Sequence, residues 1–314
     1  MTSVGVFVCA TTLTLAVVSV MKGAAMSESE VETPRHIVIG VHGLLNKPAK
    51  QVLEVWWADA IKEGLRHNHD IELPLPFELV YWADIRNTTP IALEDLDERY
   101  QEATAPLSRY DPKGIDKARA VAQKWGGRML DKEKELIGLG RNVEGLLGVK
   151  FDDLGAYYEE ALIRQRMRSR LTDALQRHQD KRILLIAHSM GSIIAYDVMR
   201  QLEDDGAVEV EYLVTIGSPL GLPIVADKIR QEFGATQTPS SVQRWTNLAD
   251  PGDKVSLDCN LADEYDPAND IQVTDVLVHN QYVNHNGKAN NHKSYGYLRA
   301  PEVSQLIRNF LQPL

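Results

Sequence analysis

A serine flanked by small residues stands where an apolar run gives way to a helical pattern. The segment ILLIAHSMGSIIAYDV carries Ser189, with Ala187 two positions before it and Gly191 two positions after it. A serine in a very tight strand-to-helix turn is presented as a nucleophile, and such a turn admits only small neighbours. The following helix would point its first amides at the reacting oxygen, so the Met190 N–H is a candidate oxyanion donor. The alternative role for this serine is to cap the helix.

An acid and a base that could activate this serine occur downstream. The segment ADPGDKVSLD contains Asp253, with Asp250 as the alternative acid, and HNGKANNHKSYGYL contains His292 shortly before the end of the chain. A serine hydroxyl needs an imidazole to accept its proton, and the imidazole needs a carboxylate to fix its tautomer. Serine, acid, histidine is one of the chain orders in which such triads occur. His285, in a polar loop, and His279, at the end of an apolar run, are the alternative bases.

A second oxyanion donor is expected in an early loop. The apolar run HIVIGV is followed by His42 and Gly43, and a backbone N–H in the loop beyond them, that of Leu44, could complete an oxyanion hole. His42 is expected to shape this loop rather than to transfer protons. The segment YLVTIGSPLGLP brings small residues to the edge where open α/β sheets bind ligands, and its Ser218 is expected to be a turn residue.

The elements that must position these residues alternate between strands and helices. Short, β-branched apolar runs predict strands, and apolar residues at helical spacing predict the helices between them. This alternation predicts an α/β fold with a mostly parallel central sheet flanked by helices. From about residue 84 to 181 the strand patterns disappear and the chain becomes charged, which indicates a long helical insertion before the serine. The expected strands lie within 36–45, 76–85, 183–187, 211–217, 242–248 and 271–278, and the expected helices within 52–65, 190–202, 223–233 and 301–311.

Taken in order, the motifs VHGLL, AHSMG, TIGSPLG, DKV and HKSY resemble those of the α/β-hydrolase superfamily of lipases and esterases. The GSPLG segment is similar to the bacterial lipase-like and GPI-inositol-deacylase-like branch. The resemblance implies an α/β-hydrolase fold with a nucleophile elbow, and a serine hydrolase that cleaves a carboxylic ester through an acyl-enzyme. Alternatives are a thioesterase, amidase or acyltransferase, or a non-catalytic hydrolase-like binding protein. The site residues that the resemblance implies are a catalytic triad of Ser189, Asp253 and His292 and an oxyanion hole of Leu44 and Met190.

Composition limits the partners of the protein. The 314 residues are 44% hydrophobic, which is ample for a sizeable core, and the formal charge of −10 argues against a nucleic-acid partner. The acidic segment DEYDPAND lacks the spacing of a calcium loop, and no Gly-rich phosphate loop is present. We therefore expect no metal and no cofactor, and a small-molecule ester or lipid as the substrate. The oligomeric state has no signal in the sequence.

The N-terminal segment 1–33 is expected to lie outside a single hydrolase domain, 34–314. Its apolar stretch 4–21 is an over-extended start, a signal peptide or a membrane anchor, and the last of these would allow membrane contact. Met26 opens a sequence typical of a cytoplasmic N-terminus. Of the two cysteines only Cys259 lies beyond this segment, which fits a reducing compartment. A cytoplasmic location is therefore expected, with an exported or membrane-anchored form as the alternative.

Overall fold

The computed structural model describes residues 35–111, 152–203, 206, 208–256, 258–268 and 270–312. The expected N-terminal segment 1–33 and residues 112–151 of the expected insertion lie outside this part of the chain. Within it, no helix combines the length and the apolar character needed to cross a bilayer.

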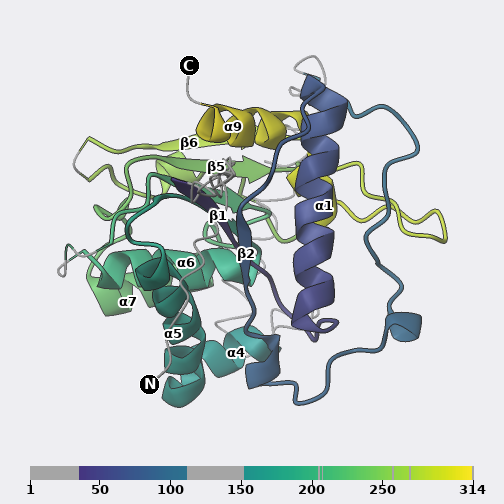
Figure 1. Ribbon diagram of the computed structural model, residues 1–314. Helices are drawn as coiled ribbons and strands as arrows, with labels where there is room; N and C mark the ends of the chain where they lie inside the picture. The colour runs from purple at the N-terminus through teal and green to yellow at the C-terminus, as the bar shows by residue number, and fades with distance from the viewer. Residues whose placement is uncertain are drawn as a thin grey trace, which may run out of the picture. The chain divides into compact units, whose positions relative to one another are not determined.

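Six parallel strands form one sheet in the described part of the chain, in the order β2-β1-β3-β4-β5-β6 (Figure 1). Every strand overlaps a segment that predicts one, although β3 extends one residue beyond it at each end and β5 one residue beyond its end, and the expected parallel α/β architecture is confirmed. The central strands are buried along nearly their whole length, as strands covered on both faces must be. The bounds are β1 His36–Val41, β2 Phe77–Val80, β3 Arg182–His188, β4 Tyr212–Ile216, β5 Trp245–Ala249 and β6 Val273–Leu277.

The strand order reverses between β1 and β3. The chain passes from β1 to β2 on one side of it, then crosses to β3 on the other side, and later strands continue in that second direction. In an open parallel sheet, the carboxyl ends of the two strands at such a reversal leave a crevice in which ligands bind. The loop that begins with His42 and the turn that contains Ser189 follow these two ends.

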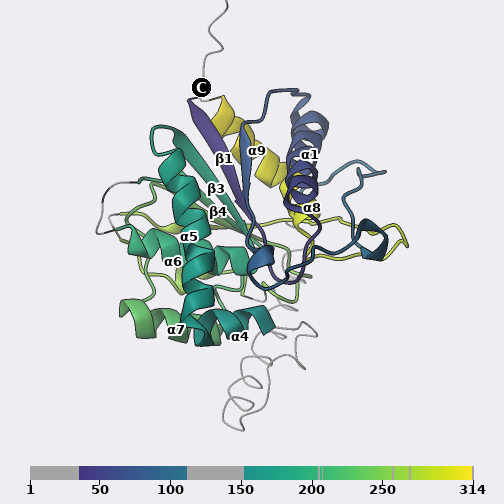
Figure 2. The same cartoon turned by 60° about the horizontal axis from the view of Figure 1, so that its bottom comes forward.

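Helices cover both faces of the sheet and give a three-layer fold (Figure 2). Alternate side chains of β3 point to opposite faces: Leu184 and Ile186 join one apolar core, and Leu185 joins the other. The first core includes residues of α1 (Lys50–His69), α8 (Ser294–Arg299) and α9 (Pro301–Leu311). The second includes residues of α4 (Asp152–Glu159), α5 (Ala161–Arg177), α6 (Met190–Gln201) and α7 (Pro223–Phe233).

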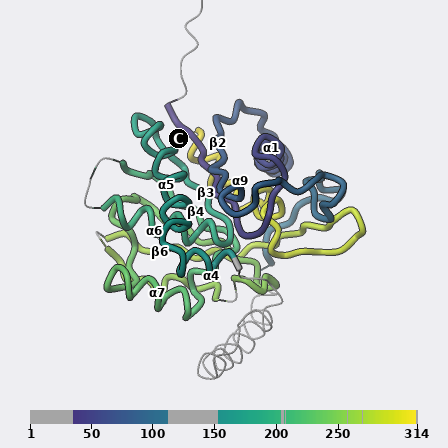
Figure 3. Tube along the Cα trace, turned by 90° about the horizontal axis from the view of Figure 1, so that it is seen from below, coloured from purple at the N-terminus to yellow at the C-terminus, as the bar shows by residue number. Residues whose placement is uncertain are grey.

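The segment between β2 and β3 is helical only in part. Its described residues form the helices α4 and α5, but 86–111 is irregular apart from the short 3₁₀ turn Leu93–Asp95. This irregular segment runs beside the loop 279–291, which leads to His292 (Figure 3). The contacts that join them are Tyr282 Oη to Arg99 O, Gln101 Nε2 to Val283 O and Ser108 Oγ to Gln281 Oε1.

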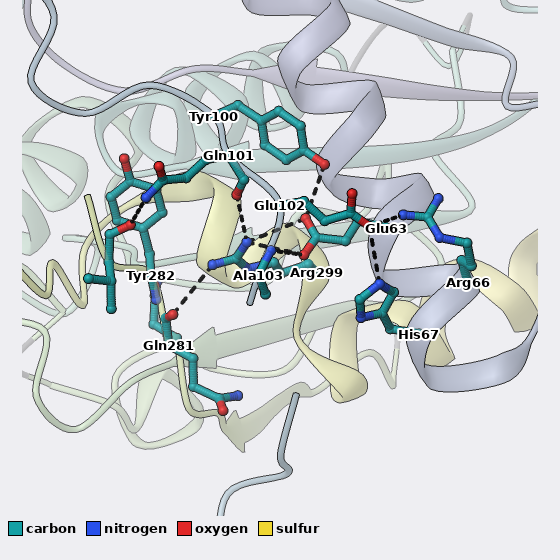
Figure 4. Close-up of polar contacts among 12 residues, drawn as sticks. Glu63, Arg66, His67, Tyr100, Gln101, Glu102, Ala103, Gln281, Tyr282 and Arg299 are labelled. Carbon is teal, nitrogen blue, oxygen red and sulfur yellow. Dashed lines mark hydrogen bonds and ion pairs between the residues drawn. The ribbon is translucent and has the colours of Figure 1, made fainter. Parts of the chain in front are cut away.

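A buried ion pair holds the middle of this irregular segment. Arg299 of α8 and Glu63 of α1 are almost completely buried, and Arg299 Nη1 lies 3.2 Å from Glu63 Oε1. The segment wraps around the pair, because the Ala103 N–H donates to Glu63 and the Gln101 carbonyl accepts from Arg299 (Figure 4). Charges removed from water need such additional hydrogen bonds. Contacts between distant residues therefore hold this segment, and no helical or strand periodicity marks it.

Candidate active site

Ser189 joins β3 to α6 in a backbone conformation that non-glycine residues rarely adopt. Its φ is 54° and its ψ is −130°. Such a conformation costs on the order of 1–3 kcal/mol and persists only where the surrounding structure enforces it. The Ser189 side chain makes no capping hydrogen bond to α6. The alternative that this serine merely caps the helix therefore does not describe it.

Glycines provide the clearance for this turn. A Cβ at position 191 would lie 2.8 Å from the His42 carbonyl oxygen and closer still to that of Val41. A Cβ at position 43 would lie 2.7 Å from the Ser189 Cβ. The start of α6 and the loop after β1 thus approach each other more closely than any larger residue would allow.

A chain of hydrogen bonds joins Ser189, His292 and Asp253. The Ser189 hydroxyl oxygen lies 3.0 Å from His292 Nε2, and His292 Nδ1 lies 2.8 Å from Asp253 Oδ2. A carboxylate can only accept, so the Nδ1 proton faces Asp253 and Nε2 is left to accept a proton from the serine. The structure thus brings the three sequence-predicted residues together from three loops.

Asp253 is completely buried and is held as an anion. Burial raises the pKa of its carboxyl, but the His292 charge and three hydrogen bonds outweigh burial and leave the pKa below its ordinary value. The donors are the His292 ring, the Val255 N–H at 2.8 Å and the Tyr297 hydroxyl at 2.8 Å. An ionised Asp253 stabilises both the tautomer of His292 and its protonated form.

The backbone of His292 is fixed on both sides of its Cα. Its N–H donates to Asn290 Oδ1 at 2.9 Å, and its carbonyl accepts from His188 Nε2 at 2.8 Å. Burial and the charge of His292 lower the pKa of His188 well below its ordinary value, so His188 is neutral. The two imidazole rings also pack together, with centroids 4.8 Å apart.

The alternative acid, Asp250, supports the loops instead of contacting His292. Its Oδ1 accepts from the Gly252 N–H at 2.7 Å and from Asn291 Nδ2 at 3.1 Å, and its Oδ2 accepts from the Asn280 N–H at 2.7 Å. One carboxylate therefore ties the turn that carries Asp253 to the loop that carries His292.

The alternative bases, His279 and His285, are exposed, and neither contacts Ser189. His279 Nδ1 lies 3.5 Å from Ser108 Oγ, and His285 Nδ1 lies 2.9 Å from the Asp97 carbonyl oxygen. Both belong to the junction between the loop 279–291 and the irregular segment 86–111. Ser218, expected to be a turn residue, accepts from the Leu220 N–H at 3.2 Å, as such a residue does.

The two predicted oxyanion donors lie beside Ser189. Met190 follows it directly at the start of α6, and Leu44 follows Gly43, whose Cα approaches the serine. Within the described part of the chain, neither the Leu44 nor the Met190 backbone N–H has a hydrogen-bond acceptor. Unpaired amides of this kind are available to an anionic oxygen.

His42 orients the peptide that carries the Leu44 N–H. The Trp82 N–H donates to His42 Nε2 at 3.0 Å, so the proton of the ring is on Nδ1, which donates to the Gly43 carbonyl at 2.9 Å. Burial, reinforced by the Lys47 charge, lowers the pKa of His42 to about 3, and the ring is neutral. Because the peptide is trans, holding the Gly43 carbonyl toward His42 turns the Leu44 N–H the opposite way.

Several residues of this site were not singled out by the sequence analysis. Tyr297 and Asn290 lie in the segment HNGKANNHKSYGYL, where only the histidines were considered. His188 follows the apolar run 183–187 at the end of β3, and a polar side chain in that place is a signal that the sequence contains. No group of three or more His, Cys, Asp or Glu residues is arranged to hold a metal ion, as far as the described residues go.

The parallel sheet, the helices on both faces and the strained serine turn after β3 define an α/β-hydrolase fold. Residues 158–245 match the model of a family described as alpha/beta hydrolase of unknown function (DUF900), and this stretch includes Ser189. No curated protein matches the chain. The comparisons thus agree with the fold and leave the substrate to be argued from the site.

Proposed function

We propose that this protein is a serine hydrolase that cleaves a carboxylic ester of a small molecule or lipid through an acyl-enzyme. The observation that carries the proposal is the hydrogen-bonded chain of Ser189, His292 and Asp253, with the serine in a strained turn at the start of α6. Nucleophile, base and orienting acid at these distances form the arrangement that activates a hydroxyl.

In the proposed reaction, Ser189 Oγ attacks the acyl carbon while its proton passes to His292 Nε2. The Leu44 and Met190 amides hold the resulting oxyanion, and the dipole of α6 adds to their effect. The tetrahedral intermediate then expels the alcohol, which takes the proton from His292. Water attacks the acyl-enzyme in the same way, releases the carboxylic acid and restores the serine.

The direction from which a substrate would approach is inferred from the exposure of Ser189 and His292. Ser189 is buried, whereas the side chain of His292 is 25% exposed. We therefore propose that the ester reaches the serine from the side on which His292 meets solvent.

A fluorophosphonate probe tests the proposal, because it labels a serine only where a base and an oxyanion hole activate it. The wild-type protein should be labelled at Ser189, and Ser189→Ala should not. An unlabelled folded protein beside a reactive control esterase would contradict the enzymatic role and favour a binding protein. p-Nitrophenyl esters of increasing acyl length then separate an esterase from a lipase, and matched thioester and anilide substrates test the other leaving groups.

A further inference from the structure

The peptide unit between Leu44 and Leu45 is hydrogen-bonded to a side chain at both its carbonyl and its N–H. Its carbonyl, on Leu44, accepts a hydrogen bond from Lys47 Nζ, and its N–H, on Leu45, donates to Asp153 Oδ2 at 2.7 Å. Hydrogen bonds with charged partners are about twice as strong as those between neutral groups. The Lys47 amino group on one side and the Asp153 carboxylate on the other therefore fix the orientation of this peptide plane.

These two hydrogen bonds hold a peptide next to a residue with a strained backbone conformation. Leu45 has φ 72°, in the left-handed region that leucine rarely occupies, at a cost on the order of 1–2 kcal/mol. The residue is 52% exposed, so apolar packing does little to hold it there. The hydrogen bonds of the peptide must therefore stabilise this strained conformation.

The anchor for Asp153 is the helix α4, which Figure 1 shows beside the loop that enters α1. Asp153 Oδ1 lies 3.4 Å from Arg86 Nε. Farther along α4, the Tyr157 hydroxyl donates to Asp197 Oδ2 at 2.6 Å, and Asp197 belongs to α6, the helix that begins with Met190. One helix thus connects the loop of one proposed oxyanion donor to the helix of the other.

We infer that Lys47 and Asp153 are positioning residues that hold the Leu44–Leu45 peptide from both ends and so keep the Leu44 N–H in place for the oxyanion. The inference rests on the proposed function. Neither side chain touches the reacting atoms, and both act through the backbone. The expected consequence is a role in the transition state and not in ground-state binding of the ester.

Lys47 and Asp153 also depend on each other. Burial lowers the pKa of Lys47 to about 7 and the Lys293 charge acts in the same direction, whereas Asp153 and Glu98 oppose them. Removing the Asp153 carboxylate would thus weaken both hydrogen bonds of the peptide, the one to the Leu45 N–H directly and the one from Lys47 through its charge.

The test compares Asp153→Ala, Asp153→Asn and Lys47→Met with the wild-type protein, using p-nitrophenyl esters and active sites counted with a fluorophosphonate. For Asp153→Ala and Lys47→Met, kcat per active site should fall about 10- to 100-fold with KM nearly unchanged. The inhibition constant of a trifluoromethyl ketone, whose adduct carries the oxyanion, should rise in step with the loss in kcat/KM. Asp153→Asn, which keeps an acceptor for the Leu45 N–H but removes the charge that supports protonated Lys47, should recover part of kcat.

Asp173→Asn and Lys62→Met make the same chemical changes at exposed helix positions and should leave kcat unchanged. Full kcat per active site in Asp153→Ala, or a fall in melting temperature alone, would overturn the positioning role. If Asp153→Ala does not fold, Lys47→Met tests the same peptide without altering α4. A wild-type protein that neither labels nor turns over any ester would instead refute the proposed function, so the two failures are distinguishable.

Discussion

Nε2 of His292 lies 3.0 Å from the Ser189 hydroxyl oxygen although 103 positions separate the two residues in the sequence. Because proton transfer between them would accompany attack on the ester, Ser189→Ala and His292→Ala should each lower kcat by about 10⁴- to 10⁶-fold. The double variant should lose little more than either single variant, since the residues act as a unit. Steady-state rates on p-nitrophenyl acetate and butyrate measure all three.

His279→Ala and His285→Ala serve as controls for that experiment, because both histidines lie in a loop junction away from the serine. Each should retain kcat within a few-fold. Loss of turnover in one of these variants, with His292→Ala still active, would assign the base to another residue.

Loss of Asp253 should mainly lower kcat, whereas loss of Asp250 should mainly lower stability. Asp253→Asn should lower kcat by about 10⁴-fold with little loss of stability, because the amide favours the wrong tautomer of His292. Asp250→Ala leaves the Gly252 and Asn280 N–H groups without their acceptor, so it should mainly reduce stability, by about 1–3 kcal/mol for each donor left buried. Urea unfolding and kcat of both variants decide; a larger loss of kcat in Asp250→Ala would reverse the assignment.

The sequence predicts the elements whose signals are local. Apolar runs mark β1 and β3, which are buried on both faces, and helical spacing marks α6 and α9, whose apolar side chains at that spacing are buried. The six residues of α8 are too few to show a helical period. The segment 86–111 has no local signal at all, since its conformation depends on distant partners such as Arg299.

In the candidate site, too, the sequence predicts what has a local signal and misses what depends on distant contacts. Chain order and turn chemistry propose Ser189 with a downstream acid and histidine, and the resemblance carried by DKV and HKSY points to Asp253 and His292, which the structure brings together with Ser189. Chain order and turn chemistry alone could not separate Asp253 from Asp250, because both carboxylates lie in one turn and only the fold decides which of them His292 meets. Asp153 was beyond prediction, since it is 108 positions from the Leu45 N–H that it accepts from.

Two helical glycines make a matched pair for testing the close approach at the serine turn. Gly191→Ala places a Cβ against the carbonyl oxygens of Val41 and His42, so it should destabilise the protein by about 1–3 kcal/mol and lower kcat by moving Ser189. Gly155→Ala in α4 meets open space and should gain about 0.5–1 kcal/mol. Equal gains in urea unfolding for both variants would show that the turn has room to spare.

Acid should destabilise the protein through its buried neutral histidines. Burial holds the pKa of His42 at about 3 and that of His188 well below its ordinary value, whereas an unfolded histidine titrates near 6.5. Between pH 6.5 and these lowered values the unfolded chain binds more protons than the folded one. The free energy of unfolding therefore falls on acidification, by up to about 1.4 kcal/mol per pH unit for each histidine.

The His42→Gln variant isolates one of these contributions. It should be less stable than the wild-type protein at pH 7.5, because the amide replaces the ring hydrogen bonds to Trp82 and Gly43 imperfectly. As the pH falls to 5, the wild-type protein loses the His42 contribution and the variant has none to lose, so the gap between them should narrow by about 2 kcal/mol. Urea unfolding at both pH values measures the gap, with His188→Gln as an independent second case. A gap that stays constant with pH would mean that His42 binds a proton equally well in the folded and unfolded chains, and the neutral, Nδ1-protonated ring that orients the Leu44 peptide would have to be abandoned.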